Sequence, residues 1–210
     1  MIEALSIIIG YLLGSFPTAY IAARLTRGVD IRRVGGGNMG ALNTTREIGL
    51  KAGSAVLLVD VAKGAATIMI AGYLGISQIW VLFAGFAAIA GHCWPVFLKF
   101  RGGKGAATAI GVFLALAPAA FACSIPVILA VIFITSNVTL GMTAGFILFP
   151  LFLWLFGQPW TVIVYAVLVT IFLGLRYLPT ARRSLKKAGN TRDFLLEKNY
   201  KPWQTRKPKP

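Results

Sequence analysis

The chain alternates between long apolar runs and short polar segments rich in Lys and Arg. One apolar run covers Ala4–Ala23, 47 residues lie between Lys51 and Lys99, and Gly105–Leu175 holds 71 residues without a charge or a histidine. Because a helix needs about 20 residues to cross a bilayer, these runs predict one, two and four transmembrane helices. Helix breaks are expected at Gly75–Gln78, Pro118, Thr135–Thr139 and Gly157–Pro159.

Composition and charge support this interpretation. Hydrophobic residues make up 57% of the 210 residues, charged residues only 13%, and the mean hydropathy is +0.76. All but one of the 21 basic residues, against six acidic ones, lie between the apolar runs or after the last of them, which disfavours a nucleic acid partner and favours anionic membrane lipid. Since cytoplasmic loops carry the Lys and Arg, we expect an all-α, seven-helix integral membrane protein with its N-terminus outside and its C-terminus in the cytoplasm.

The domain organisation follows from the same pattern. Residues 1–188 are predicted to form the membrane domain, and residues 189–210 a basic, proline-containing cytoplasmic tail that is disordered. The first run lacks a preceding basic stretch and is interpreted as a retained helix rather than a cleaved signal. Cys93 and Cys123 are expected to be small hydrophobic residues, and the oligomeric state is left open, a monomer included.

Two glycine-rich segments carry the chemistry of an anion site. Val34–Arg46 reads VGGGNMGALNTTR, and Gly91–Gly105 reads GHCWPVFLKFRGGKG, with Lys99, Arg101 and Lys104. Glycine lets backbone N–H groups converge on an anion, and an Arg binds phosphate oxygens as a two-pronged donor. Two crossings, an even number, are predicted between the two segments, so both segments lie on the same side of the membrane. The sequence therefore predicts a phosphate-handling site on that side.

Three polar side chains lie within or beside the apolar runs. His92, the only histidine, either bridges helices or serves a substrate, as a donor to phosphate or oxyanion or as a proton acceptor; we favour the second role. Asp60 and Lys63 are three residues apart on one helical face and are expected to form an ion pair. Since no carboxylate cluster is present, we predict neither a metal nor a cofactor, and the absence of a strand before the glycine segments disfavours nucleotide hydrolysis.

The segments Gly35–Arg46, Leu57–Gly64 and Gly91–Thr108 together resemble the acyl-phosphate-dependent glycerol-3-phosphate acyltransferases of bacterial membranes. The resemblance implies seven helices in the inner (plasma) membrane and an active site on the cytoplasmic face. It implies transfer of a fatty acyl group from acyl phosphate to the 1-hydroxyl of glycerol 3-phosphate, which gives lysophosphatidic acid and phosphate for phospholipid synthesis.

The resemblance also assigns candidate site residues. Asn38, Arg46, His92 and Lys104 are implied to bind the phosphates and the reacting acyl group, with a substrate phosphate or His92 as the proton acceptor. The residues expected to bind substrate or shape the phosphate loops are Gly36, Gly37, Gly40, Asn43, Arg101, Gly102, Gly103, Gly105, Thr139 and Thr180.

The chain departs from the family pattern at several hydroxyl and amide positions. Gly36 stands where the family has serine, and Met142, Tyr177 and Thr180 replace a serine, a histidine and an asparagine. These departures keep open a divergent or inactive relative that binds anionic lipid. A second alternative is a transporter of a phosphorylated anion, which could use the same two glycine-rich segments as a vestibule.

Overall fold

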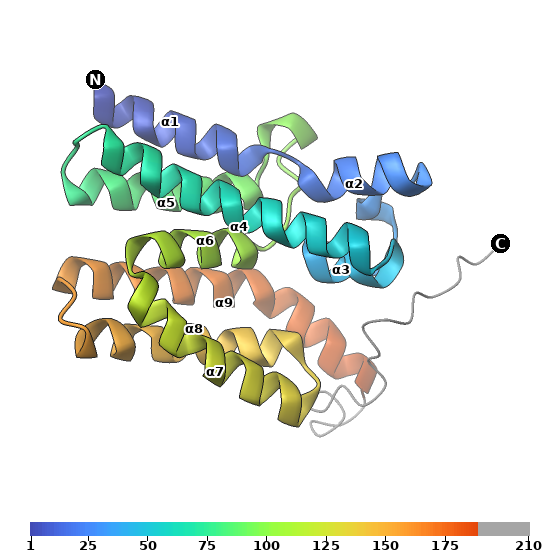
Figure 1. Ribbon diagram of the computed structural model, residues 1–210. Helices are drawn as coiled ribbons and strands as arrows, with labels where there is room; N and C mark the ends of the chain where they lie inside the picture. The colour runs from blue at the N-terminus through green and yellow to red at the C-terminus, as the bar shows by residue number, and fades with distance from the viewer. Residues whose placement is uncertain (189–210) are drawn as a thin grey trace. The chain divides into compact units, whose positions relative to one another are not determined.

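The computed structural model describes residues 1–188, and all its secondary-structure elements there are helices (Figure 1). The predicted tail, residues 189–210, lies outside the described residues. The nine α-helices in this part of the chain are α1 (Ile2–Ser15), α2 (Thr18–Arg27), α3 (Ala41–Glu47), α4 (Leu50–Tyr73), α5 (Gln78–Cys93), α6 (Ala106–Leu116), α7 (Pro118–Thr135), α8 (Val138–Leu155) and α9 (Trp160–Ala188), with short 3₁₀ turns η1 (Ile31–Arg33) and η2 (Val96–Leu98).

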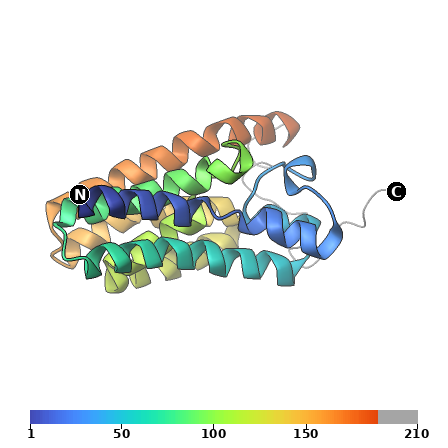
Figure 2. The same ribbon diagram turned by 90° about the horizontal axis from the view of Figure 1, so that it is seen from above.

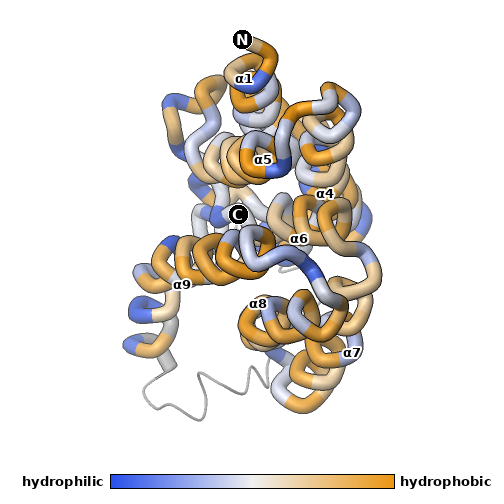
Figure 3. Tube along the Cα trace, turned by 90° about the vertical axis from the view of Figure 1, so that its left-hand side faces the viewer, coloured by the Kyte–Doolittle hydropathy of each residue, from blue (hydrophilic) through white to orange (hydrophobic). Residues whose placement is uncertain are grey.

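Six helical segments of residues 1–188 are long and apolar enough to cross a membrane. They are Ile2–Arg27, Leu50–Tyr73, Gln78–Leu98, Pro118–Thr135, Val138–Leu155 and Trp160–Arg183. The seventh apolar helix, α6, has 11 residues and spans only about 16 Å, about half of a hydrocarbon core. The hydropathy-coloured tube shows apolar residues dominating α7 and α8 (Figure 3). The chain is therefore a multi-pass helical membrane protein, and the predicted breaks at Gly75–Gln78, Pro118, Thr135–Thr139 and Gly157–Pro159 coincide with the boundaries between successive helices.

The described residues divide into two compact units that meet in sequence at Ala115 and Leu116. In the first unit α5 packs against α1 and α4, while α2 and α3 contact α4 (Figures 1 and 2). Small residues allow the close approach: a Cβ at Gly14 would collide with the Ala88 carbonyl oxygen, and one at Gly111 with that of Val61. In the second unit α8 packs against both α7 and α9.

The first membrane segment is interrupted in its middle. Pro17 has no backbone N–H, α1 ends at Ser15, and α2 begins at Thr18. The Phe16 carbonyl oxygen then accepts a hydrogen bond from the Thr18 N–H at 3.0 Å instead of joining a regular helical ladder. The interruption places polar backbone inside the first unit, next to α4 and α5.

The turn that follows α2 is fixed by an ion pair. Asp30 caps η1 by accepting from the Arg32 backbone N–H at 3.0 Å, and its carboxylate contacts the Arg32 guanidinium at 2.7 Å. The Arg32 side chain also lies over the Tyr20 ring, 5.2 Å from the centroid, and its Nη1 donates to the Leu98 carbonyl at 3.5 Å. These contacts tie the turn before the first glycine-rich segment to Leu98, within the second.

This ion pair predicts an acid-sensitive contribution to stability. The Arg32 hydrogen bonds lower the pKa of Asp30 from 3.8 to about 2. A carboxyl whose pKa is lower in the folded protein stabilises it above the unfolded pKa and loses that effect as the pH falls through the folded value. Asp30→Asn is therefore expected to lower the unfolding free energy by about 2 kcal/mol at pH 7, with the difference shrinking between about pH 4 and pH 2. Thermal unfolding of both proteins across this range tests it, and equal pH dependence in the two would contradict it.

Candidate active site

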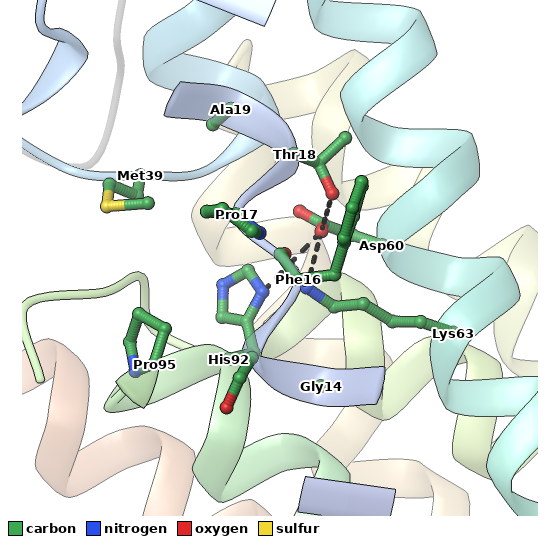
Figure 4. A pocket seen from close by; sticks show the side chains of 11 residues that line it. Gly14, Phe16, Pro17, Thr18, Ala19, Met39, Asp60, Lys63, His92 and Pro95 are labelled. Carbon is green, nitrogen blue, oxygen red and sulfur yellow. Dashed lines mark hydrogen bonds and ion pairs between the residues drawn. The ribbon is translucent and has the colours of Figure 1, made fainter. Parts of the chain in front are cut away.

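The first unit contains a small polar pocket at the interruption between α1 and α2 (Figure 4). Its volume is about 10 Å³, room for about one water molecule, so it surrounds reactive groups rather than a whole substrate. Its walls come from the interruption itself, from α4, from α5 and from the first glycine-rich loop. The lining residues are Gly14, Ser15, Phe16, Pro17, Thr18, Ala19, Met39, Asp60, Lys63, His92 and Pro95.

A buried carboxylate lies at the centre of this pocket. Asp60 Oδ1 is 2.8 Å from Lys63 Nζ, which confirms the ion pair predicted from their spacing. The same oxygen accepts from Thr18 Oγ1 at 3.2 Å and lies 3.6 Å from His92 Nδ1. Lys63 Nζ also donates to the Phe16 carbonyl at 3.3 Å. The pair is thus one part of a four-residue cluster that contains the only histidine.

His92 connects this cluster to the second glycine-rich loop. Its backbone carbonyl accepts from the Gly103 N–H at 3.0 Å, and a Cβ added to Gly103 would collide with His92 Nε2. A Cβ at Gly102 would collide with the His92 carbonyl oxygen. The two ring nitrogens therefore face different surroundings: Nδ1 faces Asp60 and Nε2 faces the loop.

The two glycine-rich loops lie together, as helix parity predicted. A Cβ at Gly103 would lie 3.0 Å from the Met39 carbonyl oxygen, so the first loop passes directly beside the second. Met39 is buried, and Leu98 packs against the hydrophobic cluster that contains it. Gly37 and Gly105 adopt φ values of 66° and 88°, a region that favours glycine. Glycines of the second loop, the Met39 carbonyl of the first loop and the imidazole thus lie together in the first unit.

Asn43 has a structural part in shaping the first loop. Its Oδ1 accepts from the Gly36 N–H at 2.9 Å, and its Nδ2 donates to the Val34 carbonyl at 3.3 Å. The side chain is buried. Both ends of the amide are therefore used inside the protein, and binding of substrate by Asn43 itself stays a prediction.

The remaining predicted residues fall in two groups. Asn38, Gly40, Arg46 and Lys104 are half-buried and belong to the two loops or to α3, while Gly36 and Arg101 are exposed. Thr139 lies in the first turn of α8, where Asn137 caps the helix, and Thr180 lies in α9. These two belong to the second unit and are described only within it, so their part in the site stays a prediction.

Sequence reasoning missed the contribution of the first membrane segment. Thr18, Ser15 and the Phe16 carbonyl line the pocket, although none was predicted. The available signal was Pro17, a residue that interrupts a transmembrane helix and frees neighbouring backbone groups.

Comparison with known proteins identifies the family. The family model described as glycerol-3-phosphate acyltransferase matches residues 4–187. The chain belongs to this family. Two named relatives are glycerol-3-phosphate acyltransferase 1 of Dehalococcoides mccartyi, 39% identical over 94% of this chain and 98% of the relative, and glycerol-3-phosphate acyltransferase of Bacillus velezensis, 39% identical over 89% and 96%.

Solved structures agree with the assignment to the acyltransferase family. The crystal structure of PlsY (YgiH), an integral membrane glycerol 3-phosphate acyltransferase, in its glycerol 3-phosphate form matches with a TM-score of 0.82 and 36% identity, covering 89% of this chain and 94% of that one. Its lysophosphatidic acid form matches with a TM-score of 0.80 and 35% identity, covering 89% and 93%. The predicted family resemblance is thereby confirmed over nearly the full described chain.

Proposed function

We propose that this chain is a membrane acyltransferase that moves a fatty acyl group from acyl phosphate to the 1-hydroxyl of glycerol 3-phosphate. The observation that carries the proposal is the meeting of both glycine-rich loops beside His92, in a chain that belongs to the acyltransferase family. The hydroxyl oxygen attacks the acyl carbonyl carbon, the bond from that carbon to the phosphate oxygen breaks, and the hydroxyl proton leaves with an acceptor. The products are lysophosphatidic acid and phosphate, and the proposed role is in phospholipid biosynthesis.

Acyl phosphate is already activated, so the protein's main tasks are orientation and charge stabilisation. Two anionic substrates repel one another, and Arg46 and Lys104 offset that repulsion while Asn38 donates hydrogen bonds. Glycine N–H groups of the loops bind phosphate oxygens, with Arg101 at the exposed rim. His92 Nε2 or a substrate phosphate accepts the proton. Substrate binding by Thr139 and Thr180, which lie in the second unit, stays a prediction. No step in this scheme calls for a metal or an organic cofactor.

The proposed topology has seven crossings: the six long segments and a seventh that includes α6, whose helix by itself covers about half of the hydrocarbon core. The N-terminus lies outside and the C-terminus inside the bacterial plasma membrane, which puts the site on the cytoplasmic face. Exposed basic residues of the first unit support an interaction with anionic lipid headgroups on that face; they are Arg24, Arg27, Arg33, Lys99 and Arg101.

A turnover assay tests the function. Purified protein in nanodiscs receives acyl phosphate and radiolabelled glycerol 3-phosphate, and both phosphate release and labelled lysophosphatidic acid are measured. We expect one phosphate per lipid formed and no product when acyl-CoA replaces acyl phosphate. Substrate binding without turnover would favour the non-catalytic lipid-binding alternative, and uptake of glycerol 3-phosphate into proteoliposomes without product would favour transport.

Restoring the family's serine at position 36 gives a sharper test of the part of the site that is proposed to bind glycerol 3-phosphate. A Cβ at Gly36 would meet only Asn43 Oδ1, at an ordinary 3.7 Å, so a side chain fits there. Gly36→Ser is expected to lower the KM for glycerol 3-phosphate about two- to tenfold, the effect of one added hydrogen bond. Gly36→Ala, which adds the carbon without the hydroxyl, is the control. Equal KM values for the serine and alanine variants would contradict a substrate contact at this position.

A further inference from the structure

Asp60 is almost completely buried, yet it does more than neutralise Lys63. Its residue exposure is 1%, and three polar groups lie close to its Oδ1: Lys63 Nζ at 2.8 Å, Thr18 Oγ1 at 3.2 Å and His92 Nδ1 at 3.6 Å. Its Oδ2, also buried, accepts no hydrogen bond from the residues that the structure describes. All of the polar contacts of this carboxylate therefore meet at a single oxygen.

A local ion pair alone would not need this arrangement. Lys63 follows Asp60 by three residues on α4 and pairs with it inside one helix. Thr18 comes from α2 and His92 from α5, so the carboxylate joins three helices at one atom (Figure 4). The imidazole is itself only 7% exposed, and its Nε2 faces Gly103. The orientation of the ring is thus fixed at both nitrogens, by Asp60 on one side and the glycine-rich loop on the other.

We propose that Asp60 is a positioning residue for His92, one that holds the imidazole with Nδ1 toward the buried cluster and Nε2 toward the glycine-rich loop. In neutral imidazole only one nitrogen carries a proton, and a carboxylate beside Nδ1 keeps the proton there. Nε2 is then the unprotonated nitrogen, and it faces the loop at which the substrates are proposed to bind. Lys63 balances the charge of the carboxylate, and Thr18 fixes the position of the shared oxygen.

The proposed role of Asp60 rests on the proposed function wherever it is tested by kinetics. A spectroscopic test of the same role does not depend on turnover. The chain has one histidine, so protein labelled with ¹⁵N-histidine and purified through a tag without histidine gives signals from His92 alone. The nitrogen chemical shifts report which ring nitrogen carries the proton. We expect the wild type in nanodiscs, in the neutral form of the ring, to carry it on Nδ1.

Two double variants separate positioning from simple charge neutralisation. Asp60→Leu with Lys63→Met replaces the pair by apolar side chains of similar size, a change that buried pairs often tolerate. Asp60→Asn with Lys63→Met also removes both charges, but it keeps an acceptor oxygen for His92 and Thr18. We expect the Leu variant to move the proton to Nε2 and to lower kcat about 10- to 100-fold, the cost of a misplaced group. Its KM values should change less than threefold, and the Asn variant should keep kcat within about threefold of the wild type.

The outcomes are distinguishable. Wild-type kcat together with an unchanged proton position in the Leu variant would overturn the proposal, as would equal losses in the Leu and Asn variants. If the Leu variant does not fold, Thr18→Val, which retains both charges, provides the second measurement: the proposal expects altered His92 nitrogen shifts, and unaltered shifts overturn it. If the wild type shows no turnover, the proposed function fails, and the nitrogen shifts still decide the role of Asp60.

Discussion

Replacing His92 by alanine is expected to lower kcat by about 10²- to 10⁴-fold, the range for losing a positioned proton-transfer group. The imidazole lies between Asp60 and the Gly103 loop, and it is the only histidine in the chain, so no second imidazole can take its place. The initial rate of phosphate release from acyl phosphate in the presence of glycerol 3-phosphate measures the effect.

The His92→Ala protein is expected to fold, because Asp60 keeps Lys63 and Thr18 as partners. Ile89→Val is the matched control: Ile89 is fully buried in the same helix, and the change removes one carbon at a cost of about 1 kcal/mol. That variant should keep wild-type kcat. A His92→Ala enzyme that retains kcat within threefold of the wild type would remove His92 from the mechanism and leave the substrate phosphate as the proton acceptor.

Gly103→Ala is expected to be nearly as damaging, although it adds only one carbon. The new Cβ would collide with His92 Nε2 and lie 3.0 Å from the Met39 carbonyl oxygen, while the Gly103 N–H is tied to the His92 carbonyl. Either the imidazole or the loop must shift, and a displacement of about 1 Å at a reacting group costs about 100-fold in rate. We expect kcat to fall by about that factor.

A double variant separates this steric effect from a general weakening of the loop. In His92→Ala/Gly103→Ala the colliding ring is absent, so the thermal unfolding temperature should recover most of what Gly103→Ala alone loses. Gly72→Ala is the control, because its Cβ has no neighbour within 4 Å, and its rate should equal that of the wild type. Wild-type kcat in Gly103→Ala would show that the contact between loop and imidazole plays no part in catalysis.

The helix breaks could be predicted because they depend on local chemistry. Pro118 begins α7, and Gly157 and Pro159 lie between α8 and α9, as their backbone preferences imply. The break at Pro17 is equally local, yet the continuous hydropathy of Ala4–Ala23 hid it. A hydropathy profile averages side-chain polarity over many residues, whereas the break depends on the missing backbone N–H group of a single proline.

The site could be predicted only in part. Parity brought the two glycine-rich loops to one side, and the structure confirms that they touch through Met39 and Gly103. Helical spacing paired Asp60 with Lys63. The contact between Asp60 and His92 joins α4 to α5 across 32 positions of sequence, and no pattern within either helix specifies it. Such contacts depend on how far two helices rotate and slide against each other, which the packing of small residues such as Gly14 decides.

The interruption at Pro17 also bears on attempts to make this protein more robust. Protein engineers would normally replace a proline that interrupts a membrane helix, for example with Pro17→Ala, to gain a continuous series of helical hydrogen bonds. In a continuous helix the Phe16 carbonyl, which now accepts from Lys63, would accept a helical hydrogen bond instead. The lysine would be left with Asp60 as its remaining acceptor, and the gain in helix regularity would be set against a poorly solvated ammonium group in the membrane interior. Pro17→Ala is therefore expected to make the first membrane segment more regular without making the protein more stable.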